Sequence, residues 1–126
     1  RACVLLEAGA RDRNTLVRAK SVAALGRIGD AKAVPVLEEA RRTAGNGFVE
    51  LLAIAGLARL KQKVSLNTPR FTLEDSTDAD ARVLAVEVLE IIGGKEAVRL
   101  IGKALEDEEM RVRVRAAAAL IKLAKI

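Results

Sequence analysis

Side chains that could carry out acid–base, nucleophilic or metal chemistry are scarce in this sequence. Its 126 residues include no histidine and a single cysteine, Cys3, and no serine or threonine is set beside a suitable base. These absences exclude imidazole catalysis, zinc sites of the Cys/His kind and nucleophilic triads. Carboxylate pairs such as Glu38/Glu39 and Asp78/Asp80 are close neighbours in the chain and face the surface, which is poor geometry for a buried acid and base. We therefore expect no enzyme activity and no cofactor.

One acidic run could in principle bind a hard cation. Residues 74–80 read Glu-Asp-Ser-Thr-Asp-Ala-Asp, but they lack the glycine and the terminal glutamate of a calcium loop. Residues 106–109, Glu-Asp-Glu-Glu, also precede an expected helix, where negative charge interacts favourably with the helix dipole. We assign both runs to helix capping and expect no metal site.

Positive charge is concentrated in the first half of the chain. Residues 1–63 carry 12 Lys and Arg against 6 Asp and Glu, and residues 64–126 carry 10 against 11, so the net charge of +5 comes from the first half. Binding to a nucleic-acid backbone is therefore an alternative function, although these groups are scattered and no Trp or Tyr is present to stack on bases. The basic residues that would take part are Arg11, Arg13, Lys20, Arg27, Arg41, Arg42, Arg59, Lys61 and Lys63.

The elements that position these residues repeat along the chain. Leu25, Leu57, Leu89 and Leu120 follow one another at steps of 32, 32 and 31 residues. A period of this length indicates stacked copies of one unit, each of which buries its apolar face only against its neighbours. Small residues in two further columns would let these copies approach closely: Ser21, Ala53, Ala85 and Ala116 in one, and Ala24, Gly56, Val88 and Ala119 in the other.

Each copy reads as a helical hairpin made of a helix A and a helix B. Helix A of the first complete copy has one apolar stripe at three- and four-residue spacing, formed by Val17, Ser21, Ala24, Leu25 and Ile28. Helix B covers residues 33–40, with Pro35 in its first turn, and has a counterpart at 97–104. Glycines in one column, Gly29 and Gly93, are placed to close helix A in a left-handed conformation. The residues predicted to cap helix A are Asn14, Asn46, Asp78 and Glu109.

The pattern fails between Lys61 and Thr77. Asn67 and Thr68 before Pro69 suggest a cap and a first turn, which predicts a short, displaced helix near 69–75. Phe71, one of two aromatic residues, is interpreted as a core plug. Such an irregular segment is either an inserted function or tolerated drift in a loop, and the sequence leaves both open.

The predicted fold is all-α, an α-solenoid of stacked antiparallel helical hairpins with a period of about 32 residues and one irregular unit at 61–77. We predict a single domain over 1–126, with a partial first unit at 1–9, units at 14–44 and 78–108, an irregular unit at 46–77, and a partial last unit at 109–126.

The run Leu16-Val-Arg-Ala-Lys-Ser-Val-Ala-Ala-Leu-Gly-Arg-Ile-Gly-Asp30, followed by Ala33-Val-Pro-Val-Leu37, resembles the HEAT-like repeat of the type found in phycobilin lyases. The resemblance implies that helix B lines a concave groove and that the protein binds another protein there. The exposed stripe of helix B that this implies contains Pro35, Glu39, Arg42, Arg70, Arg99, Lys103 and Glu106.

The resemblance also implies a structural role for one column of arginines. Arg18, Arg82 and Arg113 match the arginine that recurs near the start of helix A in this family, where it commonly pairs with acidic side chains between units. Glu50 interrupts this arginine ladder in the irregular unit. A bilin-lyase-like role in cofactor handling is a remote alternative, suggested only by the shared repeat.

The first and last helices predicted from the sequence lack their hairpin partners. The chain opens on a helix B at residues 2–8 and closes on an apolar helix A, which predicts a segment of a longer protein or end-to-end self-association through the terminal helices. No apolar run is long enough to span a membrane, so we expect no membrane association. The low cysteine content fits a cytoplasmic location.

Overall fold

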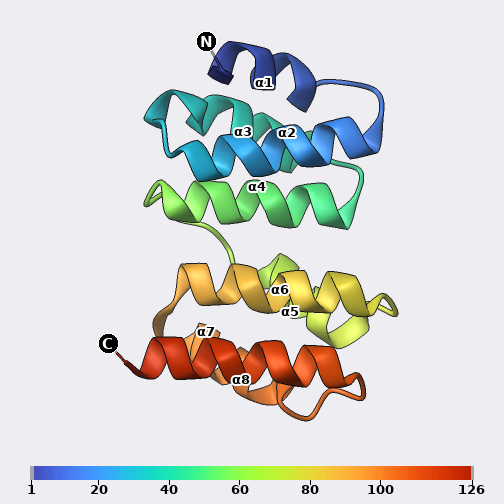
Figure 1. Ribbon diagram of the computed structural model, residues 1–126, viewed down its shortest axis with the longest axis vertical. Coiled ribbons are helices and arrows are strands. Elements are labelled where there is room, and N and C mark those ends of the chain that lie inside the picture. The colour runs from blue at the N-terminus through green and yellow to red at the C-terminus, as the bar shows by residue number, and fades with distance from the viewer. Residues whose placement is uncertain (1, 126) are drawn as a thin grey trace. The chain divides into compact units, whose positions relative to one another are not determined.

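The computed structural model describes residues 2–125, and these residues form eight α-helices and one 3₁₀ turn, with no strand among them (Figure 1). This confirms the predicted all-α fold. The helices are α1 (Ala2–Ala10), α2 (Thr15–Ile28), α3 (Val34–Thr43), α4 (Gly47–Arg59), α5 (Asn67–Asp75), α6 (Ala79–Ile92), α7 (Gly94–Ala104) and α8 (Met110–Ala124), with the 3₁₀ turn η1 at Ala31–Ala33.

The helices form two compact units that divide between Val64 and Ser65. In the N-terminal unit, α2 lies beside α4, and α1 and α3 pack against this pair. In the C-terminal unit, α6 lies beside α8, and α5 and α7 take the corresponding places. Helices α2, α4, α6 and α8 are thus the A helices and α1, α3, α5 and α7 the B helices. Each unit is a stack of helical hairpins; the single domain over 1–126 stays a prediction.

Helix ends follow the predicted caps at most positions. The side chains of Asn14, Asn46 and Asp78 accept hydrogen bonds from backbone N–H groups in the first turns of α2, α4 and α6. Gly29 ends α2 in the predicted left-handed conformation, with φ of 76° and ψ of 21°. Gly93 ends α6 with φ of 71° but ψ of −171°, so the left-handed helical conformation predicted for it is wrong, although its positive φ still favours glycine.

The prediction for Glu109 is wrong. It occupies the cap position of α8, but its side chain makes no capping hydrogen bond. The carboxylate of Asp107 instead accepts the backbone N–H of Glu109, at 2.9 Å. The same contact occurs before α2, where Asp12 accepts the Asn14 N–H at 2.8 Å while Asn14 still caps its helix, so it does not replace a cap. The carboxylate of Glu109 lies 4.0 Å from Arg111 Nε.

The core of each unit is aliphatic, as the composition predicts. Leu25, Leu57 and Leu89 from the repeating leucine column are fully buried. Val17 and Ile28 do not belong to the buried stripe of α2, because they are 40% and 47% exposed. The buried stripe runs through Ser21, Val22 and Leu25 instead, so the predicted stripe is wrong at both of its ends.

A backbone contact joins α2 to α4. A Cβ atom placed on Gly26 would lie 2.8 Å from the Cα of Gly56, and one on Gly56 would lie 2.9 Å from the Cα of Gly26. Neither distance is tolerated between carbon atoms, so only glycine fits at both positions. The small-residue columns predict close approach at Gly56 but pair it with Ala24, whereas the contact is made by Gly26.

The irregular segment forms the predicted short helix, although its details differ. Helix α5 begins at Asn67, two residues earlier than predicted, and Ser65 Oγ accepts the Asn67 N–H at 3.0 Å, so Asn67 is a helical residue and not a cap. Phe71 is 51% exposed, and the core-plug interpretation is therefore wrong. Pro69 is the buried residue of α5, and Leu73 packs against the core from the same helix.

Candidate protein-binding surface

The helix B stripe of the C-terminal unit borders a groove between α5 and α7. This cavity has a volume of about 190 Å³, and its floor includes the apolar side chains of Leu73 and Leu100. Three of the predicted partner-binding residues line it: Arg70 from α5, and Lys103 and Glu106 from the end of α7 and the turn that follows. Arg99 is exposed on α7 but does not line the groove.

Ion pairs hold part of this rim in place. Arg70 Nη1 lies 3.8 Å from Glu74 Oε1, and its Cζ lies 4.6 Å from the centroid of the exposed Phe71 ring. Arg99 pairs with Glu96 one turn earlier on α7. The hydrogen bond from Arg99, together with its charge, lowers the pKa of Glu96. Both groups are in solvent, so this pair orders the helix surface and adds little stability.

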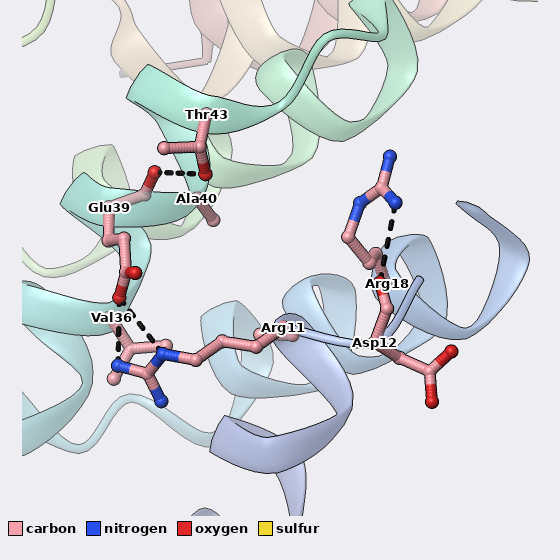
Figure 2. A pocket seen from close by; sticks show the side chains of 8 residues that line it. Arg11, Asp12, Arg18, Val36, Glu39, Ala40 and Thr43 are labelled. Carbon is pink, nitrogen blue, oxygen red and sulfur yellow. Dashed lines mark hydrogen bonds and ion pairs between the residues drawn. The ribbon is translucent and has the colours of Figure 1, made fainter. Parts of the chain in front are cut away.

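A larger cavity of about 390 Å³ lies in the N-terminal unit, between α3 and the corner that joins α1 to α2 (Figure 2). Glu39, a predicted partner-binding residue, lies on its wall and accepts two hydrogen bonds from Arg11, from Nε at 3.1 Å and from Nη2 at 2.8 Å. Pro35 and Arg42 are exposed on α3 but do not line the cavity.

The two cavities occupy the same place in their repeats. Four wall residues of the N-terminal cavity correspond, at an offset of 64 residues, to four wall residues of the α5–α7 groove. The pairs are Val36 and Leu100, Glu39 and Lys103, Ala40 and Ala104, and Thr43 and Asp107. The B helices therefore present one recurring recess whose polar side chains differ between the units.

The arginine column has one geometry at all three positions. Nη1 of Arg18, Arg82 and Arg113 donates to the backbone carbonyl six residues earlier in the chain, at 3.3, 2.8 and 2.7 Å. Each arginine thus ties the loop before helix A to the helix itself. Of the three, Arg82 also pairs with a carboxylate among the described residues, whereas Arg18 and Arg113 donate to further backbone carbonyls.

The Arg82–Asp107 pair is buried and bidentate. Arg82 Nε and Nη2 donate to the two carboxylate oxygens of Asp107 at 2.8 and 3.1 Å, and the two side chains are 7% and 10% exposed. Burial pushes the pKa of Asp107 upward, but hydrogen bonds from Arg82 and from the Glu109 N–H outweigh it and leave the pKa below its ordinary value of 3.8. The charge of Arg82 acts in the same direction. Asp107 is therefore ionised at neutral pH.

Asp107 and Thr43 were not among the predicted site residues. The sequence contains a signal for both, because they occupy the same column of the 64-residue alignment. The column holds a hydroxyl residue, Thr43, in one repeat and an acidic residue, Asp107, in the other. This column lies at the end of helix B, outside the exposed stripe that was predicted to bind a partner.

The basic residues of the first half are partly neutralised within the N-terminal unit. Arg11 pairs with Glu39, and Arg41 pairs with Glu38 at 2.9 Å. In residues 2–125, no group of three or more metal-ligating side chains comes together, and no helix is long and apolar enough to cross a membrane.

Comparison with known proteins identifies the repeat. The family model described as HEAT repeats matches residues 1–66, more than half of the chain. No curated protein matches the sequence. HEAT repeats are generally protein-interaction scaffolds and typically non-catalytic. The match agrees with the helical hairpins of the N-terminal unit and with the resemblance read from residues 16–37, and the chain belongs to the HEAT repeat family.

Proposed function

We propose that this chain is a non-catalytic HEAT repeat scaffold that binds another protein through the exposed face of its B helices. The observation that carries the proposal is the α5–α7 groove, where an apolar floor of Leu73 and Leu100 is bordered by charged side chains of both signs. Protein interfaces commonly combine an apolar centre with a polar rim of this kind. Phe71, exposed beside Arg70, adds an aromatic side chain of the type that anchors such interfaces.

The test is affinity capture with the intact chain, followed by identification of the captured protein. Charge reversal at Arg99 and Lys103 should weaken capture of that protein by about tenfold or more, since it inverts the charge of two cations on the exposed face of α7. The matched control is charge reversal at Lys20 and Arg27, two exposed cations of α2, which changes the net charge equally on an A helix. Equal capture by both double variants would overturn a role for the α7 side of this face and leave its α5 side, within residues 61–77, as the site to test.

We also propose end-to-end self-association through the terminal helices. Two apolar side chains of α1, Val4 and Leu5, are 68% and 75% exposed. On α8, Val114 and Ile121 are 59% and 60% exposed. Sedimentation velocity should show concentration-dependent oligomers that disappear when Leu5 is replaced by Lys. A monomer at all concentrations would contradict the proposal.

A further inference from the structure

One buried donor beside the N-terminal cavity is left without an acceptor. Arg18 lines this cavity, and its Nε is buried and has no hydrogen-bond partner among residues 2–125. The other nitrogens of the guanidinium are occupied, because Nη1 donates to the carbonyls of Asp12 and Arg13 and Nη2 donates to the carbonyl of Ala44 at 3.2 Å. A buried, charged N–H group without an acceptor is costly.

The C-terminal unit shows what this arginine does when an acceptor is present. Arg82 is the counterpart of Arg18 at the 64-residue offset, and its Nη1 is held in the same way by the carbonyl of Ser76. Its Nε–Nη2 edge clamps the carboxylate of Asp107. The counterpart of Asp107 in the N-terminal unit is Thr43, whose hydroxyl donates to the Glu39 carbonyl at 2.9 Å. The two arginines share the Nη1 contact, but Arg18 lacks a carboxylate, and its Nη2 donates to the Ala44 carbonyl and to Thr15 Oγ1 at 3.5 Å.

We propose that the N-terminal cavity is a socket for a carboxylate, and that an Asp or Glu side chain of the partner protein enters it and binds Arg18 Nε. The proposal rests on the protein-binding function proposed above and names the chemistry of one contact. The incoming carboxylate takes the place that Asp107 takes beside Arg82. The cavity, at about 390 Å³, is many times the roughly 30 Å³ that a water molecule occupies in the liquid, so a side chain has room to enter.

The charged groups already on the wall do not fill this role. Glu39 is neutralised by Arg11, and the Asp12 carboxylate accepts the N–H of Asn14 at 2.8 Å. Figure 2 shows Asp12 and Thr43 on different sides of Arg18, with Thr43 bonded to its own helix. The Nε–H group carries part of the guanidinium charge, and an ionised carboxylate is a stronger acceptor for it than a neutral amide, which gives the socket its selectivity.

The first arm of the test places the missing carboxylate in the chain itself. Thr43→Asp should raise the midpoint of thermal unfolding, followed by circular dichroism, by about 4 °C. Thr43→Asn, which has the shape of aspartate without its charge, should not raise it to this extent. The Nε–Hε resonance of Arg18, observed in ¹H–¹⁵N spectra of the full chain, should move toward that of Arg82 in Thr43→Asp.

The second arm adds the carboxylate from solution. Aspartate blocked at both ends, N-acetyl-aspartate N-methylamide, should shift the Arg18 Nε–Hε resonance of the wild-type chain in a saturable way. The blocked asparagine analogue should not shift it, and neither probe should act on Thr43→Asp, because its socket is filled. Inorganic phosphate at equal ionic strength is the control for anions in general.

The results separate the socket from the proposed function. The socket is overturned if the blocked aspartate leaves the Arg18 resonance unchanged, if phosphate shifts it equally, or if Thr43→Asp behaves as Thr43→Asn. None of these measurements needs a partner protein. Their results therefore test the socket independently of whether the Arg99 and Lys103 variants change capture. Once the partner is identified, Thr43→Asp should weaken its capture by about tenfold, and undiminished capture would show that no partner carboxylate enters the socket.

Discussion

The Arg82–Asp107 pair is where single side chains matter most for stability. Removing one member of a buried ion pair leaves the other charge without compensation, so Asp107→Asn should lower the free energy of unfolding at neutral pH by about 3 kcal/mol. Urea denaturation followed by circular dichroism measures this loss. Glu108→Gln is the control, because Glu108 is exposed, and it should change stability by less than about 0.5 kcal/mol.

The same pair makes the free energy of unfolding depend on pH. The pKa of Asp107 is lowered in the folded state, so its contribution is fully present above its ordinary value of 3.8 and is lost as the pH falls through the lowered value. The difference in stability between the wild type and Asp107→Asn should therefore narrow below about pH 3.8. A difference that is as large at pH 3 as at pH 7 would contradict the ionised pair.

Residue-level features were predictable where they depend on local chemistry. Asn14, Asn46 and Asp78 cap their helices because a short polar side chain needs only its own backbone to do so. Glu109 occupies the cap position of α8 without capping it, because its longer side chain extends toward Arg111, whose Nε lies 4.0 Å from Oε1. The buried pair of Arg82 and Asp107 joins residues that are 25 apart in the chain. A contact of that separation cannot be read from a local pattern.

At the scale of elements, the backbone contact between α2 and α4 makes a matched pair of glycine substitutions informative. Gly26→Ala should destabilise the chain by about 1–3 kcal/mol, because the added Cβ overlaps the Gly56 backbone. Gly102→Ala, in α7, meets no atom within 4 Å and should stabilise by about 0.5–1 kcal/mol through helix propensity. Thermal or urea unfolding distinguishes the two, and destabilisation of equal size would contradict the contact.

Helix α5 provides a second test at this scale. Phe71 is half-exposed, so Phe71→Ala should lower the free energy of unfolding by less than about 1 kcal/mol. Leu100→Ala, at a site that is 2% exposed on the neighbouring α7, should cost about 2–5 kcal/mol. A cost for Phe71 as large as that for Leu100 would restore the core-plug interpretation.

The existence of the helices was predictable from the repeat, but the orientation of α5 was not. Between residues 61 and 77 the alignment offers no register, and the period alone cannot show which side of a displaced helix faces the core. Pro69 and Leu73 face inward in place of Phe71. The groove between α5 and α7 was likewise predictable only in part: the exposed stripe yielded Arg70, Lys103 and Glu106, but not the apolar floor.

For the molecule as a whole, the charge distribution argues for a protein partner over a nucleic acid. The excess of positive charge belongs to the first half of the chain, yet Arg11 and Arg41 already pair with carboxylates there. We expect no retention of the intact chain on heparin or duplex DNA at about 0.15 M salt, where surface charges are screened beyond about 8 Å. Firm retention with a steep dependence on salt would instead favour the nucleic-acid alternative.

The meeting of Gly26 and Gly56 also limits how this protein can change over generations of mutation. In most packed pairs, enlarging one side chain can be balanced by trimming its neighbour. Here neither residue has a side chain that could be shortened, because the atoms in contact belong to the main chain of both helices. A survey of all double substitutions should therefore find these two sites intolerant, with no second-site suppressor at either glycine for a change at the other.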